Sequence, residues 1–215
     1  MSIPLPRTSR LLAALAGLLL LGAFAFPLWR ITLEAPQYPE GIGMLIRVTT
    51  VEGVKPNDLN NINGLNHYIG MHAIEPDDIP ELRFMPWVLG ALVAGALGVA
   101  AIGRRGPLVV WLAAFLAVGS AGLVDFWKWG YQYGHELDEH AIIQIPGMAY
   151  QPPLIGSKQL LNFTAHSWPD VGGVLAGLAF AAGALALWLA MRRPAPRPYS
   201  RERVLFDAPA LTGRS

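Results

Sequence analysis

The sequence contains no cysteine among its 215 residues. A chain without cysteine cannot form a disulfide, a thiolate metal site, a cysteine-bound iron–sulfur cluster or a haem attached through C-x-x-C-H. A dinuclear copper site with bridging thiolates is excluded for the same reason. Imidazole and thioether groups are therefore the only soft side-chain ligands for a transition metal.

Charged residues are also scarce, at 14% of the chain, whereas about a quarter is usual in soluble domains. Hydrophobic residues make up 53%. The sequence has no P-loop, no H-E-x-x-H and no G-x-S-x-G. No set of residues in it forms an evident acid–base pair or nucleophile, so we expect a membrane protein that is not an enzyme.

Four apolar runs, at residues 11–29, 86–103, 107–127 and 171–191, carry no charge in their middle. Each is close to the roughly 20 residues that cross about 30 Å of hydrocarbon. The expected fold class is an all-α polytopic membrane protein with four transmembrane helices. Two long loops would form a small, mixed and mostly irregular outer domain. The remaining segments are the N-terminus (1–10), the first loop (30–85), a tight turn (104–106), the second loop (128–170) and a basic tail (192–215).

Arginines flank the apolar runs at the N-terminus, the tight turn and the tail. Positive residues near helix ends stay on the cytoplasmic side. Both termini are therefore expected in the cytoplasm of a bacterial inner membrane, with both long loops in the periplasm. This orientation explains the basic tail without nucleic acid, and none is expected as a partner. The arginines are Arg7, Arg10, Arg104, Arg105, Arg192, Arg193, Arg197, Arg201 and Arg203.

The first apolar run has a second interpretation, as a cleaved signal peptide. Arg7 and Arg10, an apolar stretch and the small-x-small site Ala23-Phe24-Ala25 match that pattern. The apolar stretch continues to the interfacial Trp29, which favours a helix that is retained. Both interpretations leave the two loops on the same side of the membrane.

Three local patterns organise the loops. Residues 44–51 are rich in β-branched side chains and predict a strand. The asparagine-rich run at 57–66 favours turns over helix or strand. Asp78, Pro80 and Glu81 suggest a capped helix start that leads into the second span.

All five histidines lie in the long loops, and none lies inside an apolar run. A transmembrane haem held by two imidazoles is therefore not expected. Asp125 lies at the very end of the third run, and no acid or base lies in the middle of any run to form an ion path. Histidines near a membrane surface usually satisfy loop backbone groups, which is the plain alternative to metal binding. The histidines are His67, His72, His135, His140 and His166.

Imidazole and thioether together suit Cu(I). Copper is thus the candidate metal. The preferred site takes its ligands from both loops: His67, Met71, Met148 and His166. His72, His135 and His140 are weaker candidates. Gly70 argues against His67 and Met71 sharing one helical face, so their spacing is not evidence by itself.

Several longer motifs carry a resemblance to a known family. They are Ala35-Pro36-Gln37-Tyr38-Pro39-Glu40-Gly41, Asn63-Gly64-Leu65-Asn66-His67-Tyr68-Ile69-Gly70-Met71, Pro146-Gly147-Met148 and Tyr150-Gln151-Pro152-Pro153-Leu154-Ile155-Gly156. Over most of residues 20–190 the chain resembles the NosB-like family of small four-helix bacterial membrane proteins, which is encoded with clade II nitrous oxide reductase clusters. The resemblance implies a role near a periplasmic copper enzyme, and it supplies no catalytic residues.

Three functions remain open from the sequence. The first is an accessory protein for nitrous oxide reductase whose outer loops bind or pass copper. The second is a metal-free anchor or docking subunit for the reductase or its electron donor. The third is a quinol-linked electron-transfer subunit, which suffers because the chain shows no redox-cofactor site. All three place the protein in the lipid bilayer.

Overall fold

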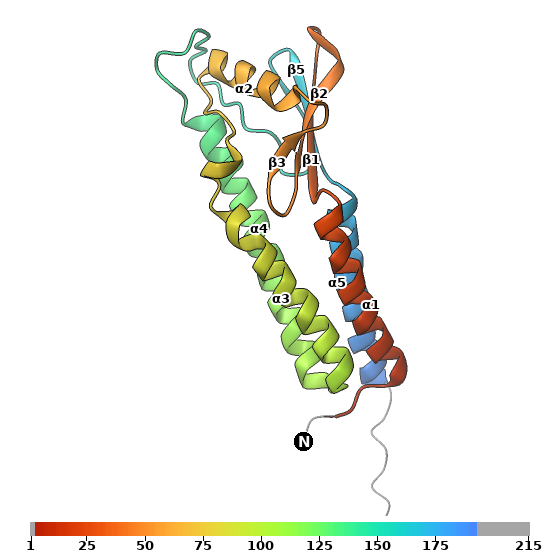
Figure 1. The fold of residues 1–215 in the computed structure, drawn as a ribbon. Coiled ribbons are helices and arrows are strands. Elements are labelled where there is room, and N and C mark those ends of the chain that lie inside the picture. The colour runs from red at the N-terminus through yellow and green to blue at the C-terminus, as the bar shows by residue number, and fades with distance from the viewer. Residues whose placement is uncertain (1–2, 193–215) are drawn as a thin grey trace, which may run out of the picture.

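A five-stranded antiparallel sheet stands at one end of a helical bundle in the computed structural model, which describes residues 3–192 (Figure 1). The expected all-α class is therefore wrong, and the fold is mixed α/β. The elements are α1 (Arg7–Ala25), β1 (Trp29–Ala35), β2 (Tyr38–Ile46), β3 (Val51–Gly53), α2 (Asp58–Ile69), the short 3₁₀ helix η1 (Pro76–Asp78), α3 (Glu81–Ile102), α4 (Arg105–His135), β4 (Gly156–Leu160), β5 (Phe163–Pro169) and α5 (Val171–Arg192). The predicted basic tail lies, beyond Arg192, outside the described residues.

Four of these helices, α1, α3, α4 and α5, are long and apolar enough to cross a membrane, which confirms the four expected spans. Helix α4 is longer than its apolar run, because it continues to His135 through the aromatic residues that were expected to begin the loop. At 1.5 Å per residue it measures about 46 Å, which exceeds the roughly 30 Å hydrocarbon layer. The last turns of α4 therefore lie at the end of the bundle that carries the sheet.

The spanning helices pack into one bundle, in which α1 lies against both α5 and α3. The α1–α5 pair and the α3–α4 pair are closest at the end that carries the N-terminus and separate toward the sheet (Figure 1). Within the α3–α4 pair, Trp111 of α4 donates its indole N–H to the Leu92 carbonyl of α3 at 2.8 Å. The buried Ser9 of α1 donates to the Ala186 carbonyl of α5 at 2.7 Å. Helix α1 is thus an integral part of the described bundle, and its retention in the mature protein stays a prediction.

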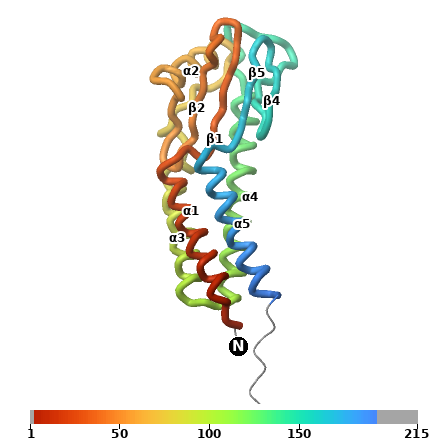
Figure 2. Tube along the Cα trace, turned by 90° about the vertical axis from the view of Figure 1, so that its right-hand side faces the viewer, coloured from red at the N-terminus to blue at the C-terminus, as the bar shows by residue number. Residues whose placement is uncertain are grey.

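The sheet has the strand order β3-β2-β1-β5-β4, so β1 and β5 lie at its centre. Strand β1 follows α1 after three residues, and β5 runs into α5 through Asp170. The two central strands therefore rise directly from the α1–α5 pair, as Figure 2 shows. The first loop supplies three strands and the second loop two, and this pairing gives the outer domain its order.

The strand expected at residues 44–51 is wrong as a single element. Strand β2 ends at Ile46, and β3 begins at Val51. The N–H of Arg47 donates to the Thr50 carbonyl at 2.8 Å, and β2 then pairs antiparallel with β3. The run of β-branched residues is therefore a hairpin.

The asparagine-rich run forms helix α2, so the expectation of turns is also wrong. Ile62 of this helix is buried, and the helix ends at Gly70 in the left-handed conformation (φ 81°). The amide of Asn63 accepts from the Ile74 N–H at 2.7 Å and donates to the Ile74 carbonyl at 3.2 Å. Asn66 donates to the His72 carbonyl at 3.2 Å. These asparagines fold the following segment back onto the helix, which a turn-forming role does not require.

The capped helix start expected at Asp78 is not formed. Asp78 ends the short helix η1, and α3 begins at Glu81 after Pro80 without a side-chain cap. The helix continues without a break through Pro86 into the second span. Pro86 lies in the second turn, so its missing N–H leaves the Leu82 carbonyl without its helical donor.

Candidate functional site

A pocket of about 540 Å³ lies at the end of α2 that points away from the sheet. On one side it is lined by His67, Met71 and His72 together with Gly70 and Ala73. The other side is formed by residues 136–138, which follow α4. We call this the α2 pocket. It brings part of the predicted copper site together, because His67 and Met71 line it with one of the weaker candidates.

Backbone hydrogen bonds lock the two sides of the α2 pocket together. The N–H of Asp138 donates to the Gly70 carbonyl at 2.8 Å, and the N–H of Ile143 donates to the Tyr68 carbonyl at 2.9 Å. A Cβ on Gly70 would lie 3.0 Å from the backbone of Asp138 and 2.9 Å from the side chain of Ala141. Glycine is therefore required here both for its positive φ and for this close approach.

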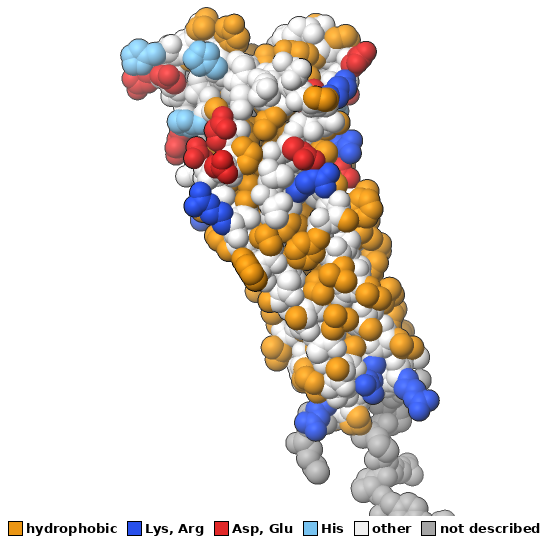
Figure 3. All heavy atoms as spheres, in the orientation of Figure 1, with side chains coloured by type: hydrophobic (Ala, Val, Ile, Leu, Met, Phe, Trp, Pro, Cys, Tyr) orange, Lys and Arg blue, Asp and Glu red, His pale blue; other side chains and the backbone are white. Residues whose placement is uncertain are grey.

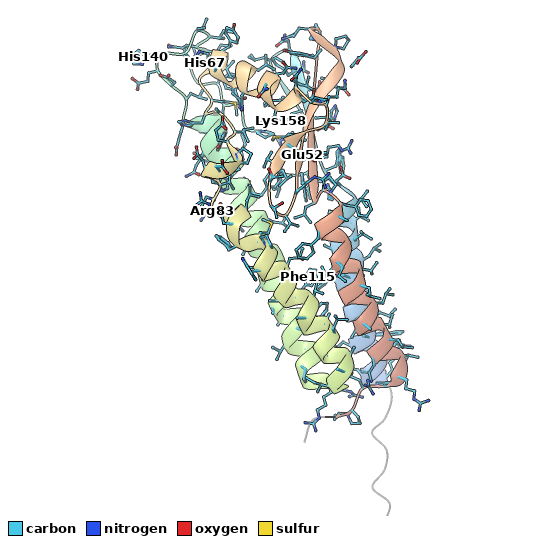
Figure 4. The ribbon with its side chains drawn as sticks, in the orientation of Figure 1. Glu52, His67, Arg83, Phe115, His140 and Lys158 are labelled. Carbon is cyan, nitrogen blue, oxygen red and sulfur yellow. The ribbon has the colours of Figure 1, made fainter. Side chains whose placement is uncertain are left out.

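The acidic side of the α2 pocket carries negative charge at neutral pH. The pKa of Asp138 is lowered, chiefly because the backbone N–H of His140 donates to its carboxylate at 2.8 Å. The side chain of His140 is 3.3 Å from the same oxygen. His67 lies near enough to lower this pKa further when it is protonated. Figure 4 shows His67 and His140 at this end of the molecule.

The remaining predicted ligands lie outside the α2 pocket. Met148 belongs to a turn in which its N–H donates to the Ile145 carbonyl. His166 lies on β5. Asp58, in the first turn of α2, is hydrogen-bonded to β2 and to the segment after β3. At 1.5 Å per residue, His67 lies roughly 14 Å further along the helix, away from these strands. His135 stacks on Tyr131 with ring centroids 4.0 Å apart. Within residues 3–192, no group of three or more His, Asp and Glu side chains is arranged to hold a metal ion.

A second cluster forms around His166 and was not anticipated from the sequence. The hydroxyl oxygen of Ser157 lies 2.6 Å from Nδ1 of His166, and Oε1 of Glu34 lies 3.7 Å from Nε2. The three residues come from β4, β5 and β1, which are neighbours in the sheet. Only the register of these strands brings the residues together, and no local motif signals it.

These features define a protein with four candidate membrane-spanning helices and a mixed α/β domain at one end of the bundle. Comparisons with protein-family models, with curated proteins and with solved structures find no match. The resemblance to NosB-like proteins therefore stays a prediction.

Proposed function

We propose that this chain is a membrane-anchored accessory protein of a periplasmic copper enzyme, the nitrous oxide reductase system, and that it binds Cu(I) as cargo in the α2 pocket. The observation that carries the proposal is the convergence of His67, Met71 and His72 on one pocket. Two imidazoles and a thioether form a donor set that Cu(I) prefers. The family resemblance points to the same metal.

The charge distribution supports a bacterial inner membrane with the sheet end in the periplasm. Within residues 3–192 every acidic residue lies at the sheet end or in the last turns of α4. Arg7, Arg10, Arg104 and Arg105 lie at the opposite end. Figure 3 shows the belt of hydrophobic side chains between these ends. By the positive-inside rule, this distribution supports an orientation with the arginine end in the cytoplasm and the α2 pocket in the periplasm.

The construction of the α2 pocket suits transfer of a metal ion. His67 and His72 are exposed, so an incoming donor group can replace either imidazole. Glu136 and Asp138 add negative charge beside the neutral donors and attract a cation.

The test is a Cu(I) titration of the full chain in detergent under reducing conditions, against a competing chelator. We expect one Cu(I) per wild-type chain and less than a tenth of that affinity in the variant that combines His67→Ala, Met71→Ala and His72→Ala. His135→Ala is the matched control, because it removes an exposed imidazole that lies outside the pocket lining and stacks on Tyr131, and it should bind as the wild type does. Equal copper binding in the triple variant and the wild type would contradict the proposal.

A metal-free docking role is the second candidate, and the surface beside the α2 pocket favours it. Tyr68, Ile142, Ile143 and Ile145 are exposed on the same loop and helix end. Cells in which the triple pocket variant supports normal nitrous oxide reduction, while Ile142→Glu with Ile143→Glu abolishes it, would establish docking instead of copper transfer. The opposite pattern would establish the copper role.

A further inference from the structure

Ser157, His166 and Glu34 form a line across three neighbouring strands. Ser157 and His166 are direct cross-strand partners in the β4–β5 ladder, and His166 is the partner of Thr32 on β1. Glu34 is two residues beyond Thr32, so it faces the same side of the sheet. The hydroxyl of Ser157 lies 2.6 Å from Nδ1 of His166, and the carboxylate of Glu34 lies 3.7 Å from Nε2. We call these three residues the β4–β5–β1 cluster.

Glu34 faces Nε2 of His166 at 3.7 Å, which is an ion-pair distance and longer than a direct hydrogen bond. A carboxylate beside Nε2 favours the tautomer that carries its hydrogen there. In that tautomer Nδ1 has the free lone pair and accepts the hydrogen bond from the Ser157 hydroxyl. This is the order of a nucleophile, a base and an orienting acid, which activates serine in acyl transfer.

The β4–β5–β1 cluster lies on the accessible face of the sheet. Along β5 the alternate residues Ala165 and Ser167 are fully buried, whereas the His166 side chain is 28% exposed. Ser157 is exposed. Trp168, two residues from His166 on the same face, is 53% exposed. An incoming molecule thus meets the serine hydroxyl with an apolar aromatic surface beside it.

The edge position of β4 supplies backbone donors next to the serine. Strand β4 is the last strand of the sheet and pairs only with β5 among the described strands. In an antiparallel ladder alternate residues direct their N–H groups away from the partner strand. An unpaired N–H therefore belongs to Ser157 or to an adjacent residue of β4, where it can stabilise an oxyanion formed at the serine.

We propose that the β4–β5–β1 cluster is an ester-cleaving site, and this proposal is independent of copper binding. Oγ of Ser157 attacks the carbonyl carbon of a carboxylic ester while Nδ1 of His166 takes the hydroxyl proton. The bond from that carbon to the alcohol oxygen breaks, and the alcohol leaves with the proton from His166. Water, deprotonated by His166, then hydrolyses the acyl-serine to a carboxylic acid and restores Ser157. Glu34 is a positioning residue, and Trp168 favours esters with an apolar acyl chain.

The test uses the full chain in detergent with a fluorophosphonate probe and with p-nitrophenyl butyrate. We expect one covalent adduct, located on Ser157 by peptide mass spectrometry. Labelling and hydrolysis should fall by about 100-fold or more in Ser157→Ala and in His166→Ala. Gln159→Ala is the matched control, since it changes an exposed side chain two residues along β4, and it should keep full activity.

Glu34 needs a measurement that a purely structural role would not change. Glu34→Gln keeps an acceptor oxygen but loses the charge, so we expect a lower rate and a shifted pH profile of hydrolysis with unchanged circular dichroism. A folded wild-type protein with no adduct on Ser157 would overturn the proposal. Labelling at the wild-type rate in folded His166→Ala would overturn it as well. Because Ser157→Ala removes one exposed oxygen, it also tests the proposal if His166→Ala fails to fold.

Discussion

The carboxylate of Asp58 accepts a hydrogen bond from the backbone N–H of Gly43 at 3.0 Å, and the same oxygen accepts from the N–H of Lys55 at 3.1 Å. Asp58 is only 3% exposed. The first turn of α2 is thereby fixed to β2 and to the segment after β3. The far end of the same helix carries His67, so this one carboxylate sets the position of half of the α2 pocket.

Asp58→Ala should destabilise the outer domain by about 1–3 kcal/mol, because it leaves the buried N–H of Gly43 and the part-buried N–H of Lys55 without their acceptor. The measurement is the midpoint of thermal unfolding of the purified protein in detergent, followed by circular dichroism. Asp77→Ala is the control, since Asp77 is exposed on η1 and its removal should leave the midpoint unchanged. Equal midpoints for the two variants would contradict the role assigned to Asp58.

Gly183→Ala should destabilise the helical bundle by about 1–3 kcal/mol. A Cβ at this position would lie 2.5 Å from the Trp111 ring and 3.1 Å from Leu112. The ring cannot move aside freely, because its N–H is bonded to the Leu92 carbonyl.

Gly177→Ala on the same helix is the control for this substitution, because its Cβ would meet no atom within 4 Å. It should be neutral or slightly stabilising, since alanine is the better helix former. Thermal unfolding in detergent compares the two variants, and a Gly183→Ala protein as stable as Gly177→Ala would show that α4 and α5 are not packed as described.

The ion pair between Arg30 and Asp170 should give the protein an acid-sensitive contribution to stability. Burial alone would raise the pKa of Asp170, but the N–H of Val171 and the guanidinium of Arg30, at 2.7 Å, outweigh burial and hold the pKa below its ordinary value. The contribution is therefore complete above about pH 4, the ordinary aspartate range, and it is lost as the pH falls through the lowered pKa.

Asp170→Asn should accordingly lower the unfolding midpoint at pH 7 and differ less from the wild type near pH 3. Glu40→Gln provides the comparison, because the Glu40 side chain is 88% exposed and its pair with Lys55 is worth little. A constant difference between Asp170→Asn and the wild type across this pH range would exclude the titration of Asp170 as the cause.

The proposed orientation can be tested directly, because any introduced cysteine is the only one in the chain. In intact cells whose outer membrane has been permeabilised, a membrane-impermeant maleimide should label Asn60→Cys on α2. It should label Gly106→Cys, at the start of α4, only after lysis. Both residues are exposed, so accessibility within the protein is matched. The reverse pattern would place the α2 pocket in the cytoplasm.

The sequence predicts the spanning helices well, because about 20 consecutive apolar residues are the length of helix that crosses the hydrocarbon layer. The sheet depends on pairing between distant segments, and β5 contains residues such as Ala165 and Ser167 that strand propensity does not favour. The sequence does not predict helix α2, because asparagine usually favours turns. Here the asparagine side chains instead form hydrogen bonds to the segment that follows the helix. His67 and Met71 are close in sequence, so their shared pocket follows from local structure. Glu34 and His166 meet only through strand register.

The α2 pocket has a mechanical consequence that follows from its two attachments. Its His67 side is carried by α2, which Asp58 fixes to the sheet, and the sheet rises from the α1–α5 pair. Its Asp138 side follows α4, which belongs to the other pair. The backbone hydrogen bonds from Asp138 to Gly70 and from Ile143 to Tyr68 join these two sides, so the pocket is a tie between the sheet and the end of α4. A tilt of α4 relative to the sheet would strain these two hydrogen bonds and thereby displace His67 relative to Asp138.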